Sequence, residues 1–516
     1  MKKRTQGSKF DFRLSGGGAR ALFTLALAVA SAALSAFSGF GGEKVRTWKI
    51  VYGTAEGPEG RALELLSSEM GAIHDRDPGV YTLHVLPCER AGSRVVQKKN
   101  AILLGTPASN AAFAAFLKPD DVPKGGYLVR TLDLPDGSQR VLVAGDTPAA
   151  VIWAVEDFLD EGLNALSVRA GGDGLRYRSK IFERGRIGRY ESRQVPKTPV
   201  RSVFTWAHVI GDYRDYFRNL ARLRFNEVIL WNNCPPVNAA EVVAYAHSWG
   251  IRVLWGFAWG WSTDCRNVDM AHLDRLEDDI LREWRSVWHP LGGDGIYFQS
   301  FTELDQEEIN GRSIAATVVK LVNRVSAKIR AESPGERIVF GLHARSVKKR
   351  LAEIDETDPS VEILWEDCGG FPFNYGKPFD PSGDRPLVDA ILAENRDIGI
   401  VLKCSLVQDW SRFAYQSGPY VLGCASAAVK EEDARVAEEL WRPFCADWQV
   451  RGRVAYDVVR HIQSARRARP SALNVAVNAN GRVRFPLALM AELFWSADDP
   501  YDAIVERVAR RTWVGM

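Results

Sequence analysis

The chain has 516 residues, of which 46% are hydrophobic and 25% are charged, as in an ordinary globular protein. Single domains mostly run to about 100 to 250 residues, so we expect two folded units. The 67 basic and 64 acidic residues give a formal charge of +3, which leaves no basic excess to hold a phosphate backbone. Nucleic acid is therefore excluded as an expected partner.

The N-terminus is typical of an export signal. Lys2, Lys3 and Arg4 precede an apolar run over 21–37, and alanines near its end offer cleavage sites of the A-x-A type. We expect residues 1–44 to be a signal peptide with a short linker, and the protein to be periplasmic, secreted or on the cell surface. An uncleaved anchor is the alternative, although the run is short for a membrane span.

The first folded unit is expected over 45–184. Strands are predicted at Trp48–Tyr52, Tyr81–Leu86, Ala101–Gly105, Tyr127–Leu134 and Arg140–Ala144. Helices are predicted at Gly60–Asp75, Asn110–Leu117 and Thr147–Leu159. Short strands alternating with helices indicate a small α/β sandwich, and a charged stretch with two prolines over 182–199 suits a domain boundary.

From residue 200 onward, strand-length apolar runs alternate with helical segments, which is the pattern of βαβ units on a parallel sheet. Strands are predicted at Arg201–Trp206, Glu227–Trp231, Arg252–Phe257, Gly295–Gln299, Arg337–Leu342, Val361–Trp365 and Ile398–Lys403. The intervening helices are Tyr213–Leu223, Ala239–His247, Leu273–Trp284, Ala315–Arg330 and Leu387–Glu394. An eighth strand at Tyr420–Gly423 or Leu473–Val477 would complete a (β/α)8 TIM barrel.

We therefore expect the α/β fold class: a barrel over 200–425, preceded by the sandwich and followed by a helical part over 426–516. Helices are predicted in that last part at about Lys430–Ala468 and Pro486–Arg511.

The active site of a (β/α)8 enzyme lies at the carboxyl ends of the strands, where the βα loops converge. In this sequence those ends carry aromatic, amide and charged side chains. Pyranose rings stack on aromatic faces, and their hydroxyls bind amides and carboxylates, so the pattern indicates a carbohydrate substrate. The predicted substrate-binding residues are Trp206, Trp231, Asn232, Asn233, Trp259, Gln299, Arg312, His343, Trp365, Lys403 and Trp410.

Glycosidic bonds are cleaved by two carboxylic groups, one protonated and one ionised. Glu303 follows the fourth predicted strand in an apolar context that favours a protonated acid, so we predict it as the proton donor. Glu366, Asp367 and Asp409 follow the sixth and seventh strands and are the candidates for the second carboxylate.

The segment Phe298-Gln-Ser-Phe-Thr-Glu303, with Gly311-Arg-Ser313 before a long helix, resembles the fourth-strand region of the α-glucuronidases of glycoside hydrolase family 67. Weaker similarities lie at 364–373, at 402–410 and in the C-terminal helices. The resemblance implies single-step inverting hydrolysis with Glu303 as the acid, and Asp367 or Asp409 as the base. It also implies an N-terminal domain of the kind found in families 20 and 67. The chain carries Gln299 and Glu366 where the family has basic residues.

Two alternatives differ in function. A family 20-like N-acetylhexosaminidase needs an Asp directly before the acid, where this chain has Thr302. A non-catalytic carbohydrate-binding barrel would have lost the second carboxylate.

No cofactor is expected. The histidines show no metal-ligand spacing, and the seven cysteines contain no C-x-x-C, so we predict neither a metal site nor a redox motif. The cysteines are expected to be mostly buried and free. The sugar, its anomeric configuration and the oligomeric state are not fixed by the sequence.

Overall fold

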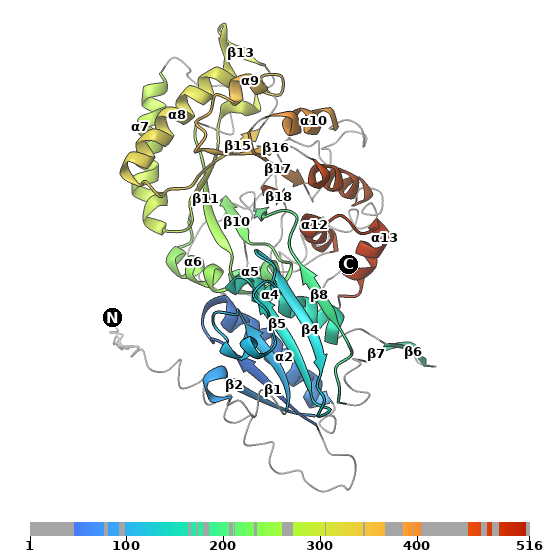
Figure 1. Cartoon of the computed structure of the whole chain (residues 1–516). Helices are drawn as coiled ribbons and strands as arrows, with labels where there is room; N and C mark the ends of the chain where they lie inside the picture. Colours follow the sequence, from blue (N-terminus) through green and yellow to red (C-terminus); the bar gives the residue numbers. More distant parts are fainter. Residues whose placement is uncertain are drawn as a thin grey trace, which may run out of the picture.

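The computed structural model describes residues 46–76, 81–91, 99–163, 167–171, 174–178, 185–205, 210, 212–231, 235–260, 272–304, 306–343, 346–366, 385–394, 396–403, 452–465, 472–476 and 485–511. A small α/β domain lies below a barrel surrounded by helices, with the C-terminal helices beside the barrel (Figure 1). The predicted signal segment at 1–44 lies outside the described residues.

The first domain is a six-stranded sheet with two helices on one face. Its strands are β1 (Arg46–Tyr52), β2 (Tyr81–Pro87), β3 (Asn100–Gly105), β4 (Tyr127–Asp133), β5 (Gln139–Gly145) and β8 (Glu191–Gln194), in the order β2-β1-β3-β5-β4-β8. The first three strands and β5 are parallel, whereas β4 is antiparallel to both β5 and β8. Because β8 belongs to this sheet, the domain extends beyond the predicted boundary at residue 184.

Capping and turn chemistry explain the helices and the hairpin of this domain. The helix α2 (Gly57–Arg76) and the helix α4 (Pro148–Asp157) cover one face, and α4 continues as a π-helical segment, η4 (Phe158–Leu163). The hydroxyl of Thr147 caps α4 by accepting from Ala150 N at 3.3 Å. Gly137, with φ of 78°, makes the turn between β4 and β5.

One local prediction in this domain needs correction, and one hairpin was not predicted. The helix predicted at 110–117 is one 3-10 turn, η3 (Ala111–Ala115), because the Asn110 amide donates to the carbonyls of Val51 and Leu104, both at 2.9 Å. These bonds tie the start of the turn to the ends of β1 and β3. The short hairpin of β6 (Ser167–Gly171) and β7 (Gly174–Arg178) was not predicted. A 3-10 turn, η2 (Cys88–Arg90), follows β2.

The second unit is a closed barrel of eight parallel strands, as the sequence predicts. The strands are β9 (Val200–Phe204), β10 (Glu227–Trp231), β11 (Arg252–Ala258), β12 (Ile296–Gln299), β15 (Ile338–His343), β16 (Glu362–Glu366), β17 (Ile398–Lys403) and β18 (Ala472–Ala476). The strand β18 is the second of the two candidates for the eighth position, and it pairs with both β17 and β9. The barrel therefore continues to residue 476, and the predicted end at residue 425 is wrong.

Alternation along the strands separates two apolar layers. Along each strand, every second side chain points into the lumen. These side chains form a single cluster that includes Phe204, Ile229, Leu254, Tyr297 and Val339. The others point outward, against the surrounding helices. These helices are α5 (Tyr213–Arg222), α6 (Ala239–Ser248), α7 (Leu273–Glu283), α8 (Ile314–Glu332), α9 (Leu351–Ile354) and α10 (Arg385–Ala393).

Shorter elements complete the barrel. The turns η7 (Trp284–Trp288) and η8 (His289–Leu291) follow α7, and the turn η9 (Phe301–Glu303) follows β12. A small hairpin of β13 (Glu308–Ile309) and β14 (Arg312–Ser313) precedes α8.

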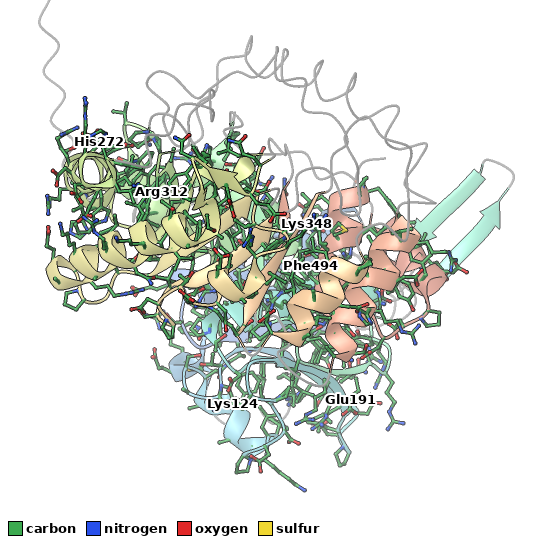
Figure 2. All side chains as sticks on the ribbon, turned by 90° about the horizontal axis from the view of Figure 1, so that it is seen from above. Lys124, Glu191, His272, Arg312, Lys348 and Phe494 are labelled. Atoms are coloured by element: carbon green, nitrogen blue, oxygen red, sulfur yellow. The ribbon has the colours of Figure 1, made fainter. Side chains whose placement is uncertain are left out.

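The described C-terminal part is helical apart from β18. It contains a helix at 452–464, then α12 (Phe485–Trp495) and α13 (Tyr501–Ala509). Every residue of α12 is buried, as expected for a helix that is apolar on all sides. Phe494, labelled in Figure 2, packs edge-on against Phe225 with ring centroids 6.2 Å apart. Among the described helices, none is long and apolar enough to cross a membrane.

A buried ion cluster joins both domains to the C-terminal helices. The carboxylate of Glu492 in α12 accepts from the guanidinium of Arg224, which follows α5, and from Arg511 Nη2 at 2.6 Å. Arg511 Nε also donates to Asp160 Oδ2 in the first domain, at 2.9 Å. Burial alone would raise the pKa of Glu492, but Arg224, Arg511 and Arg507 outweigh it and lower this pKa to about 2.

An arginine of the first barrel strand packs against two indoles, which also contact each other, at the same junction. The guanidinium of Arg201 lies 4.7 Å from the ring centroid of Trp153 in α4 and 5.1 Å from that of Trp495 in α12. Burial lowers its pKa to about 9, so the group stays charged at neutral pH. The small domain, the barrel and α12 therefore share one core.

Glu492→Gln tests the ion cluster. The change leaves Arg224 buried without its counter-charge and Arg511 with Asp160 alone, so the free energy of unfolding should fall by about 3–5 kcal/mol in urea titrations. Glu506→Gln removes an exposed i,i+4 pair with Arg510 on α13 and should cost about 0.5 kcal/mol or less. Equal losses in the two variants would contradict the assignment.

The pH dependence of stability follows from the same carboxylate. The folded-state pKa of Glu492 is about 2, below its ordinary value of 4.5, so ionised Glu492 stabilises the fold above about pH 4.5. This contribution is lost as pH falls from there towards 2. The difference in stability between the parent chain and Glu492→Gln should therefore be full at pH 7 and shrink towards pH 2, in urea titrations at a series of pH values. A difference that stayed constant over this range would be inconsistent with a lowered pKa.

Candidate active site

Only part of the predicted site lies within the described residues. Six of the predicted residues fall outside them: Trp206, Asn232, Asn233, Asp367, Asp409 and Trp410. For three more, Glu303, His343 and Lys403, the backbone is described and the side chain is not. The site is therefore built from Glu366, Gln299 and their surroundings, with Trp231, Trp259, Trp365 and Arg312 placed relative to them.

Glu366 and Gln299 meet in the barrel lumen. Glu366 is the last residue of β16, Gln299 is the last residue of β12, and both side chains are buried. The amide Nε2 of Gln299 donates to Glu366 Oε2 at 2.6 Å and to Tyr297 Oη at 3.0 Å. The short distance to the carboxylate is typical of a charge-assisted hydrogen bond. The structure thus brings together two of the predicted residues, from strands that are separated by β15.

The layer below this pair is aromatic and closed. The rings of Phe204 and Tyr297 lie 5.1 Å apart, and the Trp231 ring lies 5.9 Å from that of Tyr297. Trp231 therefore faces the lumen and is part of the lumen cluster. Gly341 of β15 leaves the space that the Tyr297 hydroxyl occupies, since an added Cβ would lie 1.9 Å from that oxygen. Glu366 and Gln299 form the first polar layer above this floor.

Two of the predicted sugar-stacking residues face the other way. The Trp259 ring is fully buried and stacks on Phe298 with centroids 3.6 Å apart, and Trp365 is buried in the same outer layer. A strand alternates its side chains, so Trp365 must point away from the lumen if its neighbours Leu364 and Glu366 point into it. These two indoles pack the barrel against its helices, and we leave them out of the candidate site.

The turn that carries Glu303 is held from two sides. The hydroxyl of Ser300 donates to the carbonyl of Trp259 at 2.7 Å. The carbonyl of Thr302 accepts from Ser346 Oγ at 2.6 Å and from Ser346 N at 3.2 Å. The backbone of η9 is therefore tied to β11 and to the segment after β15. Neither serine was predicted, because a single Ser after a strand carries no distinguishing pattern.

Arg312 lies on the hairpin that follows this turn. It is exposed in β14, and Figure 2 shows it on the barrel part together with Lys348. The neighbouring Ser313 caps α8, accepting from Ala316 N at 3.3 Å, and also donates to Glu353. Arg350 Nε donates to Glu307 Oε2 at 3.0 Å across the base of the hairpin. The structure thus fixes the hairpin as a projecting element and does not bring Arg312 to the Glu366 and Gln299 pair in any described contact.

No described group of three or more His, Cys, Asp or Glu side chains could hold a metal ion. Cys88, the one cysteine whose side chain is described, is a free thiol of intermediate exposure.

These features define a (β/α)8 barrel protein with a buried acid and amide at the carboxyl ends of its strands, and with a sheet domain in front. No protein-family model and no curated protein matches the chain. Among solved structures, the chain is similar to the family 20 β-N-acetylhexosaminidase from Streptomyces coelicolor A3(2). The match has 12% identity and a TM-score of 0.48, and it covers 92% of this chain and 91% of that one.

A second similar structure is described as that of CpGH84D. The identity is 11% and the TM-score 0.43, with 69% of this chain and 57% of that chain covered. Neither of these two structures is described as an α-glucuronidase.

Gly341→Ala tests the floor of the site. The new methyl group would overlap the Tyr297 hydroxyl, so the phenol must move and its bond with Gln299 must weaken. We expect the free energy of unfolding to fall by about 1–3 kcal/mol, measured by urea titration with tryptophan fluorescence. Gly335→Ala, at an exposed turn where an added Cβ meets nothing within 4 Å, is the control and should change stability little. A full-stability Gly341→Ala variant would contradict this packing.

Proposed function

We propose that the protein is a glycoside hydrolase whose active site lies at the carboxyl ends of the barrel strands. The observation that supports this most directly is the hydrogen bond between Gln299 and Glu366. Gln299 stands four residues before Glu303, so this contact places a buried carboxylate of the sixth strand beside the strand that leads into Glu303. Two carboxylic groups at one mouth are what glycoside hydrolysis requires.

In the proposed reaction, Glu303 is the general acid and donates its proton to the glycosidic oxygen as the bond to the anomeric carbon breaks. One of Glu366, Asp367 and Asp409 is the base, which takes a proton from the water that attacks the anomeric carbon. The products are two hydroxyl compounds. The acid is left ionised and the base protonated until both exchange protons with solvent. The resemblance to family 67 implies that this occurs in one step, with inversion of configuration.

The residues that follow the barrel strands are proposed to bind the substrate. Trp206 and Trp410 would supply ring faces for pyranoses, and Asn232, Asn233, His343 and Lys403 would bind hydroxyl or acidic substituents. The resemblance to α-glucuronidases makes an α-glucuronide one substrate class to test. We also propose that the segment 1–44 exports the enzyme, so that it meets an extracellular or periplasmic carbohydrate.

An N-acetylhexosaminide is the second substrate class. It is the kind of substrate named for the family 20 enzyme that is similar over most of this chain. Substrate-assisted hydrolysis needs a carboxylate directly before the acid to hold the acetamido group, and here that position is Thr302, which is fully buried and neutral. If this chain cleaves such substrates by that mechanism, the carboxylate that holds the acetamido group must come from another strand.

Glu303→Gln tests the assignment of the acid. Against a panel of aryl α-glucuronides and N-acetylhexosaminides, kcat for the best substrate should fall by about three orders of magnitude or more, while ligand affinity is nearly unchanged. Following the first-formed product by NMR should show inversion. Glu506→Gln, on the remote helix α13, should leave kcat unaltered.

The outcomes separate the competing functions. Parent-level hydrolysis by Glu303→Gln would exclude Glu303 as the acid, and a retained configuration would exclude the single-step mechanism. Binding of sugars by the parent chain without hydrolysis of any substrate would favour the non-catalytic carbohydrate-binding barrel.

A further inference from the structure

The side-chain amide of Gln299 donates two hydrogen bonds in the barrel lumen. Its Nε2 faces two oxygens, Tyr297 Oη at 3.0 Å and Glu366 Oε2 at 2.6 Å, and all three side chains are buried. An amide nitrogen carries two hydrogens, so one N–H can be donated to each oxygen. An ionised carboxylate can only accept hydrogen bonds, which fixes the amide with its nitrogen towards Glu366.

The surroundings hold this geometry in place. Tyr297 and Gln299 lie two residues apart on β12 and therefore point into the lumen from the same strand. The Tyr297 ring is packed against Phe204 and Trp231, and its hydroxyl fits over Gly341. The phenol oxygen thus anchors one N–H of the amide, and the other N–H stays directed at the carboxylate.

Burial of a carboxylate disfavours its ionised form, and a hydrogen bond donated to the carboxylate favours it. Glu366 is fully buried, and the hydrogen bond that Gln299 donates to it is one that favours the ionised form. A base in hydrolysis must be ionised when the water attacks. An amide that is neutral but donates at 2.6 Å can keep the carboxylate ionised without adding a charge to the lumen.

We propose that Gln299 is the positioning residue for Glu366, holding its carboxylate ionised and in place for the role of base. The inference rests on the proposed function, in which Glu366 is one of three candidates for the second carboxylate. It narrows that choice to Glu366, and it assigns a role to an amide that does not itself take part in proton transfer.

Gln299→Met tests the inference, because Met keeps the length and volume of the side chain but donates nothing. The acidic limb of the kcat profile should move up by about one to two pH units, the shift expected when a carboxylate loses one hydrogen bond from a neutral donor. KM at a pH well above that limb should change little. In Gln299→Asn the amide is one methylene too short to reach the Glu366 carboxylate, so the acidic limb should shift in the same direction. This variant replaces Gln299→Met if the Met variant does not fold.

The matched control is Gln463→Met. Gln463 is also a buried amide with several bonds, donating to the Leu493 carbonyl at 2.9 Å and to Thr198 Oγ1 at 3.2 Å, and it packs against α12 instead of the lumen. Its loss should lower stability without moving the pH profile. A shift in Gln463→Met equal to that in Gln299→Met would overturn the proposal, since loss of a buried amide anywhere would then have the same effect.

A second measurement does not depend on hydrolysis. The Glu366 carboxyl is titrated by ¹³C NMR in the full-length protein with labelled glutamate, and its signal is assigned from Glu366→Gln. An upward shift of the titration midpoint in Gln299→Met supports the positioning role even if no glycoside is hydrolysed, in which case only the proposed function fails. An unchanged midpoint in both Gln299 variants would overturn the inference whatever the activity.

Discussion

Closure of the barrel is the constraint on which the site depends. The strands β18 and β9 are far apart in the chain, and their pairing completes the ring that β10 to β17 begin. Once the ring is closed, all eight strands present their carboxyl ends at one face, and alternate side chains are forced into the lumen. The meeting of Gln299 and Glu366 follows from this closure, since their strands are not neighbours in the sheet.

Much of this architecture could be predicted from the sequence, because buried parallel strands are short apolar runs whose period contrasts with that of helices. Glu227–Trp231 and Ile398–Lys403 were predicted to the residue. The strand β8 was missed because its residues, Glu-Ser-Arg-Gln, carry no apolar pattern at the edge of a sheet. The last barrel strand stayed ambiguous because its partners lie far along the chain, and only the register distinguishes it from another short apolar run.

The ends of the barrel strands could be predicted, but the face of the sheet on which each side chain lies could not. Strand ends could be found, and Gln299, Glu366 and Trp231 do point into the lumen. Trp259 and Trp365 were assigned to the wrong face, because a tryptophan at a strand end gives no sign of which side of the sheet it occupies. The face of Trp365 follows only once its neighbours are placed: Leu364 and Glu366 point into the lumen, so Trp365 between them points outward. The ion cluster around Glu492 had no signal at all, because its charges are brought together only by tertiary structure.

The contacts of Arg201 with Trp153 and Trp495 have a consequence for the order of assembly. One indole belongs to the first domain and the other to a helix near the end of the chain, so a nascent polypeptide cannot complete this core until almost all of it has been synthesised. The first domain can form its own sheet during translation, as domains commonly do. The face that carries Trp153 is covered only after the last helices have been synthesised. A shortened chain that ends before α12 would leave that face open, with Trp153 and Arg201 lacking the ring that covers them. The two units are therefore not modules that could be exchanged freely between barrels.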